Sequence, residues 1–153
     1  MGLGTRDRLP AGLGAIIVTP DGRNAIVVDV GANRAMDAAF VEERSAILDG
    51  ASTLLTVTEA PLAAVTRAIE LAHSRGKTVV QNPAPAVTLE PSLLARVTVL
   101  TPNASELTVL TGRETGSIDA AAAAAASLLE RGAQCVVVTL GGDGALLCRA
   151  GSA

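Results

Sequence analysis

Aromatic residues are almost absent from this chain. Phe40 is the only one among 153 residues, and there is no Trp or Tyr. The core must therefore be built from Ala, Val, Leu and Ile, with fewer large side chains to anchor it. The chain also has no set of rings on which nucleic-acid bases could stack, which disfavours a single-stranded nucleic-acid-binding protein.

An excess of positive charge and long hydrophobic runs are lacking too. Twelve Lys and Arg stand against fifteen Asp and Glu, for a formal net charge of −3, and no basic stripe is present. Because nucleic-acid binding depends on clustered basic side chains, we expect no nucleic-acid partner. No apolar run is long enough to cross a bilayer, and the first residues lack the apolar centre of a signal peptide. We therefore expect a cytoplasmic protein that does not bind membranes.

Cysteine is scarce. Cys135 and Cys148 are thirteen residues apart, a spacing that matches neither a CxxC pair nor a zinc pattern. Both are predicted to be reduced thiols, as is usual in the cytoplasm.

What the chain does contain is apolar material in a regular order. Hydrophobic residues make up 49% and charged residues 18%, which predicts a packed domain rather than a disordered segment. Two β-branched runs, 13–19 and 24–30, flank Pro20-Asp21-Gly22-Arg23 and predict a hairpin. Strand-like and helix-like segments then alternate: a helix at 37–48, a strand at 52–57, a helix between Pro61 and Gly76, strands at 78–81 and 97–100, helices at 104–111 and 119–131, and a strand at 134–140.

This alternation predicts an α/β domain. Continuous apolar strands between helices indicate a mostly parallel sheet with helices on both faces. The expected organisation is one domain over residues 1–153, with the hairpin at 12–33 and an α/β core at 37–153. Ligands of such sheets collect beyond the carboxyl ends of the strands. That rule points to four residues at or just beyond the ends of predicted strands, namely Glu59, Asn82, Asn103 and Thr139.

Each candidate also has a structural explanation. Asn103 and Glu106 are spaced as a capping box, and the same pair at a helix start could instead meet a phosphate or its Mg²⁺. The glycine-rich segment 139–144 fits a hairpin turn between apolar strands, or a loop that lets a ligand approach the backbone. Glu59 is either an acid that complements a helix dipole or a hydrogen-bonding group in a pocket. The spacing leaves these alternatives open.

Three segments in order carry a resemblance to a known family. Gln81-Asn82-Pro83-Ala84-Pro85-Ala86 is followed by Thr101-Pro102-Asn103-Ala104-Ser105-Glu106 and then by Thr139-Leu140-Gly141-Gly142-Asp143-Gly144. Together with Gly31-Ala32-Asn33 and Glu59-Ala60-Pro61, they resemble the ribokinase pattern of the phosphofructokinase-B-type carbohydrate kinases, over roughly residues 12–150. The resemblance implies a ribokinase-like, three-layer Rossmann-type α/β fold. This is a mostly parallel sheet flanked by helices, with part of a small β-lid in the hairpin.

Functional roles follow from the resemblance alone. It implies that Asn103 contacts the phosphates of ATP, that Glu106 helps to place Mg²⁺, and that Glu59 lies near the sugar. The residues implied to border the ATP site are Thr139, Leu140, Gly141, Gly142, Asp143 and Gly144. The implied activity is ATP-dependent phosphorylation of ribose or a similar sugar, and the implied partners are a small-molecule nucleotide and a sugar. A homodimer through the lid or an exposed sheet edge is a further option.

The sequence also departs from the family pattern. Residues 1–11 match nothing in the family, and the lid strand carries Gly12-Leu13-Gly14-Ala15 in place of Thr-Gly-x-Ala. Two family segments are not found in the 153 residues: Gly-Gly-Lys-Gly-x-Asn, and Asp-Thr-x-Gly-Ala-Gly-Asp with its catalytic aspartate and anion-hole amides. We therefore expect the domain to be incomplete at both ends and inactive alone, with the potassium site beyond Ala153. Two alternatives stay open: a non-catalytic nucleotide-binding or regulatory module, which could complete its site with another chain, and a non-functional truncated product.

Overall fold

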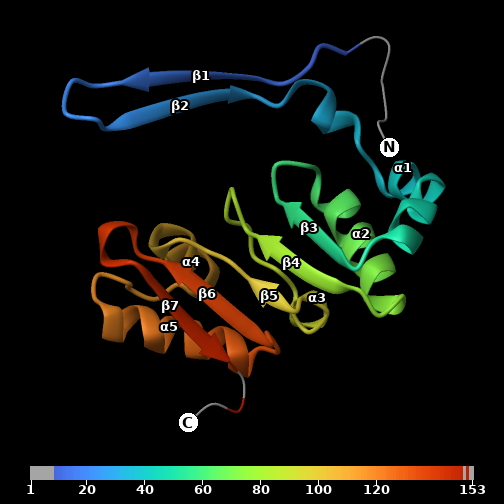
Figure 1. Ribbon diagram of the computed structural model, residues 1–153. Coiled ribbons are helices and arrows are strands. Elements are labelled where there is room, and N and C mark those ends of the chain that lie inside the picture. Colours follow the sequence, from blue (N-terminus) through green and yellow to red (C-terminus); the bar gives the residue numbers. More distant parts are fainter. Residues whose placement is uncertain (1–8, 150, 152–153) are drawn as a thin grey trace.

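An antiparallel hairpin precedes the rest of the fold. The computed structural model describes residues 9–149 and 151, and in it β1 (Leu13–Val18) pairs with β2 (Asn24–Asp29) along their full length. At the turn, the Thr19 amide donates to the Arg23 carbonyl at 2.8 Å, and Arg23 Nε donates to Asp21 at 2.7 Å. The predicted hairpin is therefore confirmed, and it extends away from the remaining elements (Figure 1).

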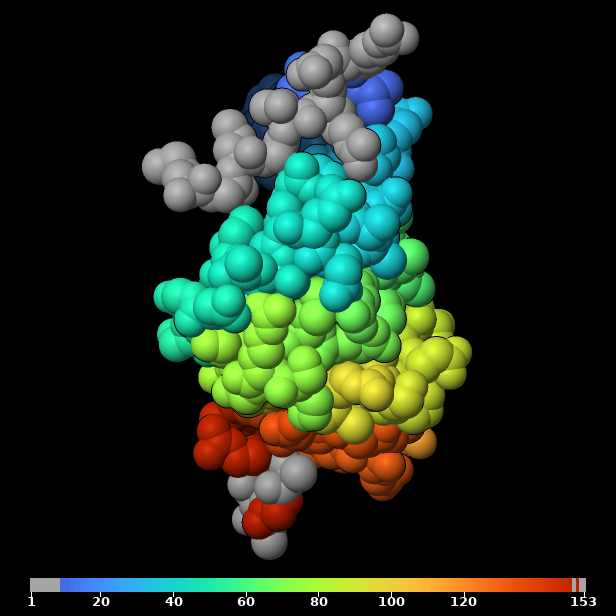
Figure 2. Space-filling view, turned by 90° about the vertical axis from the view of Figure 1, so that its right-hand side faces the viewer, coloured from blue at the N-terminus to red at the C-terminus, as the bar shows by residue number. Residues whose placement is uncertain are grey.

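A five-stranded sheet forms the centre of the molecule. Its strands lie in the order β3 (Thr53–Val57), β4 (Thr78–Asn82), β5 (Val99–Leu100), β6 (Cys135–Thr139) and β7 (Ala145–Arg149). The strands from β3 to β6 run parallel, and β7 returns antiparallel to β6. Because the spatial order follows the chain order, the colours pass in bands from one end of the molecule to the other in Figure 2. The predicted, mostly parallel sheet is confirmed.

Helices and short helical turns connect the strands. The α-helices are α1 (Ala38–Glu43), α2 (Leu62–Ser74), α3 (Pro91–Leu94), α4 (Ala104–Thr111) and α5 (Ile118–Glu130), and the 3-10 turns are η1 (Gly31–Ala35), η2 (Ser45–Gly50) and η3 (Gly141–Asp143). No described helix combines the length and the apolar character needed to cross a membrane.

Three details differ from the predicted elements. The single helix expected over 37–48 is wrong, because Arg44 leaves helical geometry (φ −109°, ψ 8°) and separates α1 from η2. Its guanidinium stacks on the Phe40 ring, 3.8 Å from the centroid. The strand expected at 97–100 is shorter, because Val97 belongs to the turn after α3, where its amide donates to the Leu94 carbonyl at 3.0 Å. The short helix α3 was not predicted at all.

The helices pack on one face of the sheet. The register aligns Leu100 of β5 with Val136 of β6, and both side chains are 0% exposed, as is Val79 on the same face of β4. They join one apolar cluster with residues of three helices: Val65, Ile69, Leu107, Leu110, Ala121, Ala124, Ala125 and Leu128. On the opposite face Leu55 is 71% exposed and Leu147 is 62% exposed. Within residues 9–149 and 151, the expected helical cover is therefore found on one face only.

Gly31 connects the hairpin to the rest of the fold. It is buried with φ +52°, and a Cβ there would lie 2.6 Å from backbone atoms of Pro10, Ala11 and Gly12. The amide of Ala32 donates to the Pro10 carbonyl at 2.8 Å, so the two legs of the hairpin meet at this point. Only glycine combines this backbone conformation with so close an approach.

Candidate functional site

Two residues predicted at the nucleotide site, Asn103 and Thr139, lie side by side at one end of the sheet. Asn103 forms an isolated parallel bridge with Thr139, and the Thr139 amide donates to the Pro102 carbonyl at 3.0 Å. Thr139 is the last residue of β6, and Asn103 immediately precedes α4. The structure thus brings both residues to the carboxyl ends of the parallel strands, where α/β sheets bind ligands.

Asn103 and Glu106 form a capping box at the start of α4. Asn103 Oδ1 accepts from the Glu106 amide and Glu106 Oε2 accepts from the Asn103 amide, both at 2.8 Å. The structural alternative for this pair is therefore confirmed, but it uses only one polar side-chain atom of each residue. Among the described residues, Asn103 Nδ2 and Glu106 Oε1 have no hydrogen-bond partner. An amide donor and a carboxylate oxygen thus remain available to a ligand.

The glycine-rich segment forms the turn between β6 and β7. The Leu140 amide donates to the Gly144 carbonyl at 2.8 Å, and Gly141 and Gly144 have φ values of +61° and +90°, which favour glycine. The expected turn is confirmed. Beside it lies a small cavity of about 130 Å³, lined by Ala104, Thr115, Gly116, Ser117, Ile118, Leu140 and Asp143. This recess joins the turn to the first residue of α4 and the loop before α5.

A pair of threonines holds that loop against α4. Thr115 Oγ1 donates to the Ala104 carbonyl at 2.9 Å and lies 2.8 Å from Thr108 Oγ1. Thr108 Oγ1 also donates to the Ala104 carbonyl at 3.2 Å. The wall of the recess is therefore fixed to the same helix that Asn103 caps.

Glu106 is the candidate metal ligand of this region. The described residues contain no group of three or more His, Cys, Asp or Glu side chains that could hold a metal ion. A single carboxylate fits Mg²⁺, which is usually held by one or two carboxylates together with water and substrate phosphates. The donor chemistry of Glu106 Oε1 therefore suits Mg²⁺ shared with a nucleotide, and it does not suit a metal held by protein alone.

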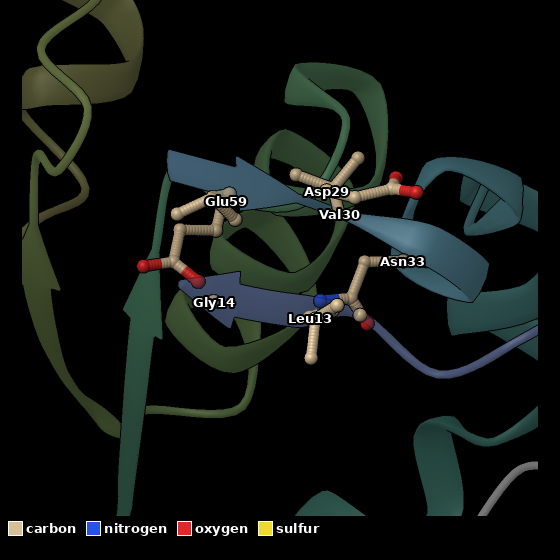
Figure 3. A pocket seen from close by; sticks show the side chains of 8 residues that line it. Leu13, Gly14, Asp29, Val30, Asn33 and Glu59 are labelled. Carbon is tan, nitrogen blue, oxygen red and sulfur yellow. The ribbon is translucent and has the colours of Figure 1, made fainter. Parts of the chain in front are cut away.

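A second cavity lies between the hairpin and the loop after β3. It measures about 340 Å³ and is lined by Gly12, Leu13, Gly14, Val28, Asp29, Val30, Asn33 and Glu59. Glu59 comes from the loop after β3, whereas the other lining residues belong to the hairpin and its base (Figure 3). Glu59 is exposed, and α2 has no acidic residue in its first turn. The arrangement favours Glu59 as a pocket residue over Glu59 as a partner of the helix dipole.

Asp29 and Arg34 stabilise the base of the hairpin. Asp29 Oδ1 accepts from the Gly31 amide at 3.0 Å and pairs with Arg34 Nη2, while Arg34 Nε donates to the Gly31 carbonyl at 3.2 Å. The hydrogen bond from Gly31, followed by the charge of Arg34, holds the pKa of the Asp29 carboxyl below its usual value. Asp29 is therefore a carboxylate at neutral pH, and its partners come from the hairpin base.

The predicted site residues fall into two groups. Asn103, Glu106 and the segment 139–144 lie together, whereas Glu59 lines the other cavity. Asn82 is the last residue of β4 and lines neither of these two cavities. Sequence reasoning assigned no role to Asp29 or Asn33. The available signal was Gly31-Ala32-Asn33 after an apolar strand, which the resemblance identified without giving it a function.

Comparison with protein families is consistent with this arrangement. Residues 5–153 match the family described as pfkB family carbohydrate kinase. The match begins earlier than expected, so the prediction that residues 1–11 fall outside the family is wrong for residues 5–11.

Two of the relatives that the chain resembles are ribokinases. The chain is 35% identical to a ribokinase of Haemophilus influenzae over 140 residues, which are 92% of this chain and 46% of that protein. It is 34% identical to the ribokinase of Mus musculus over 144 residues, covering 94% of this chain and 44% of that protein. The chain thus spans about half the length of the curated relatives it matches.

A solved structure shows the same fold. The ribokinase of Arabidopsis thaliana, complexed with ribose and ATP, matches with a TM-score of 0.84 and 26% identity. The match covers 95% of this chain and 47% of the Arabidopsis chain. The predicted ribokinase-like α/β fold class is confirmed.

Proposed function

This chain belongs to the pfkB family of carbohydrate kinases, and we propose that it carries part of the ATP site and the sugar-covering lid of a ribokinase-like sugar kinase. The proposed reaction transfers the γ-phosphoryl group of ATP to a hydroxyl of ribose or a similar sugar. The observation that carries the proposal is the pairing of Asn103 with Thr139, which puts a free amide donor beside the glycine-rich turn.

In this proposal the nucleotide is held by side chains that the capping box already fixes in the absence of a ligand. Asn103 Nδ2 donates to a phosphate oxygen of ATP, and Glu106 Oε1 holds Mg²⁺ directly or through water. The residues from Thr139 to Gly144 border the nucleotide. Phosphoryl transfer depends mainly on positioning and on stabilising charge, so a fixed donor and a free carboxylate oxygen suit it.

The cavity of about 340 Å³ is the proposed sugar site. Glu59 accepts hydrogen bonds from sugar hydroxyls, and the β1–β2 hairpin covers the sugar as a lid. Few polar groups on otherwise apolar walls are usual for a small-molecule site, and Glu59 has no side-chain partner among the described residues. The complex of the Arabidopsis ribokinase with ribose and ATP supports a sugar and a nucleotide as partners.

Calorimetric titration with Mg-ATP tests the nucleotide half. Asn103→Asp retains an oxygen that can cap α4 but replaces the amide donor with a carboxylate that repels phosphate. We expect saturable binding by the wild type, a loss of roughly tenfold or more in Asn103→Asp, and no change in Ser105→Ala, an exposed residue of the same turn. Equal affinities for wild type and Asn103→Asp, or a heat-silent titration of folded wild type, would refute the proposal.

We further propose that the 153 residues do not complete phosphoryl transfer alone. They contain no Asp-Thr-x-Gly-Ala-Gly-Asp segment, and removing general-base assistance costs about 10²–10⁴-fold in rate. The test is ADP production with ribose and ATP. A steady rate that depends on ribose and is proportional to the amount of this chain would contradict this part of the proposal.

The hairpin is also the proposed contact of a homodimer. Every residue of β1 and β2 is exposed, including Ile17 at 61% and Val27 at 65%. A two-stranded hairpin with such surfaces is marginal by itself, so a second copy would stabilise it. Sedimentation equilibrium should show a dimer that Ile17→Lys weakens and Ile47→Lys, 53% exposed in η2, does not. A monomeric wild type at high concentration would exclude the dimer.

The state of the two cysteines is relevant to the cellular compartment of the protein. Cys135 is buried and Cys148 is partly buried, and both are free thiols, as the sequence predicted. Free thiols support the proposed cytoplasmic location.

A further inference from the structure

The cavity under the hairpin contains two side chains that are free to bind a ligand. Its polar lining side chains are those of Asp29, Asn33 and Glu59, and the remaining lining residues are glycine or aliphatic. Asp29 already binds the Gly31 amide and Arg34. Asn33 and Glu59 are exposed and have no side-chain partner among the described residues. In Figure 3 the carboxylate of Asp29 points away from Glu59, which leaves Asn33 and Glu59 to the cavity.

These two side chains belong to different parts of the fold. Asn33 lies in η1, where its backbone N–H donates to the Val30 carbonyl at 3.1 Å. The neighbouring Arg34 connects η1 to Asp29 of β2 through its side chain. Glu59 follows β3 of the sheet. Asn33 is therefore anchored to the hairpin, and Glu59 is anchored to the sheet.

The room between them depends on Gly14. This residue of β1 lines the cavity, and a Cβ added there would meet nothing within 4 Å. Its missing side chain leaves space next to the apolar side chain of Val28, with which it is paired. A larger residue at position 14 would reduce the space in the cavity, and its Cβ would meet no other atom within 4 Å.

The chemistry of the pair fits a polyol. A carboxylate only accepts hydrogen bonds, whereas an Asn amide both donates and accepts. One hydroxyl of a sugar can thus donate to Glu59 while a second accepts from Asn33 Nδ2. We propose that Asn33 is a ligand-contacting residue of this cavity, and that a pentose bridges Asn33 on the hairpin to Glu59 on the sheet. This inference rests on the proposed sugar site and deepens it, because it names the contact that the hairpin makes.

The proposed contact of one pentose with both Asn33 and Glu59 has a consequence for ligand selectivity. A ligand that lacks the second hydroxyl makes no hydrogen bond to Asn33 Nδ2, so it should bind more weakly than a pentose that has both hydroxyls. Asp29 and Arg34 act as positioning residues, because they hold η1 and do not themselves meet the ligand in this arrangement.

The test is a titration of the isotopically labelled chain with D-ribose, followed by nuclear magnetic resonance. We expect the side-chain amide signals of Asn33 to shift saturably, and Asn33→Ala to weaken D-ribose binding about tenfold. The matched control is Asn24→Ala, an exposed asparagine at the other end of β2 that does not line the cavity. Gly14→Val should weaken D-ribose binding while the hairpin signals are retained.

Three results would overturn the inference. They are unchanged affinity in Asn33→Ala, D-ribose shifts near Glu59 without shifts of the Asn33 side chain, and no saturable D-ribose binding by folded wild type. Mg-ATP binding at Asn103 is measured separately and without sugar. A failure of the nucleotide proposal is therefore distinguishable from a failure of this one.

Discussion

The two faces of the five-stranded sheet differ greatly, although the same strands supply both. On the helix-covered face, Val79, Leu100 and Val136 are 0% exposed. On the open face, Leu55 and Leu147 are 71% and 62% exposed. The hairpin resembles the open face, since all of its strand residues are exposed. Apolar composition therefore does not reveal which surface is covered, and within residues 9–149 and 151 the side chains of the sheet pack closely on one face only.

The largest effect should come from truncating the covered face. Leu100→Ala removes a fully buried side chain from β5 and should lower the free energy of unfolding by about 2–5 kcal/mol. Leu55→Ala is the matched variant on the open face and should change it by less than about 0.5 kcal/mol. Chemical denaturation followed by far-UV circular dichroism measures both. Similar losses in the two variants would show that the open face is covered in solution.

The next largest effect on stability should come from a substitution at Gly31, where the exposed hairpin joins the rest of the fold. Gly31→Ala brings a Cβ within 2.6 Å of three backbone atoms. We expect it to lower the free energy of local opening of the hairpin by about 1–3 kcal/mol. Gly22→Ala measures the effect of backbone strain alone, because Gly22 has φ +84° but its Cβ would meet open space, and we expect it to open the hairpin less than Gly31→Ala does. Hydrogen exchange of the β1 and β2 amides measures the opening. If both variants exchange alike, the crossing at Gly31 does not hold the hairpin.

A stabilising change is expected within the covered face. Gln81 is fully buried in β4, where its Nε2 donates to the Asn82 carbonyl at 2.9 Å and its Oε1 has no partner among the described residues. Because an unpaired buried acceptor is costly, Gln81→Met should raise the free energy of unfolding by about 1 kcal/mol. Thr78→Met, exposed at the start of the same strand, should not. A destabilised Gln81→Met would mean that a bound water satisfies the amide.

The smallest expected effect is on the acid dependence of stability. It comes from an ion pair at the edge of the helical layer, where α1 packs against α2. Arg67 Nε donates to Glu42 at 2.6 Å, and this hydrogen bond holds the pKa of the Glu42 carboxyl below its ordinary 4.5. Since the folded-state pKa is lowered, the pair stabilises fully above pH 4.5 and is lost as the pH falls through the folded pKa. Glu42→Gln should therefore flatten the acid dependence of the unfolding midpoint. Glu114→Gln, in the loop after α4, should leave that dependence as it is in the wild type.

Local sequence signals were enough to predict several elements. Pro20-Asp21-Gly22-Arg23 indicated the hairpin, and Asn103, Glu106 and Gly112 indicated both ends of α4. These features depend on a few neighbouring residues, whose hydrogen bonds form within one turn. The short helix α3 was missed because four residues are too few to show a helical period.

Features that depend on distant contacts could not be predicted. β6 is apolar on nearly every residue, so its sequence does not distinguish the covered Val136 from the outward-facing Val137. The pairing of Asn103 with Thr139 was expected only in part: both were assigned to strand ends, but their adjacency depends on β5 lying beside β6. Asn33 was missed as a pocket residue because its cavity forms only when the hairpin lies over Glu59.

The bridge between Asn103 and Thr139 has a consequence for the entropy of binding. The capping box fixes the Asn103 side chain. The hydrogen bond from the Thr139 amide to the Pro102 carbonyl fixes the backbone of the end of β6 and of the residue before Asn103. Immobilising a side chain on binding usually costs about 0.5–1.5 kcal/mol, and here that ordering is complete before any ligand arrives. A nucleotide bound at this edge would lose its own freedom but would not have to order the protein. Its affinity should therefore reflect the ligand's flexibility more than that of the site.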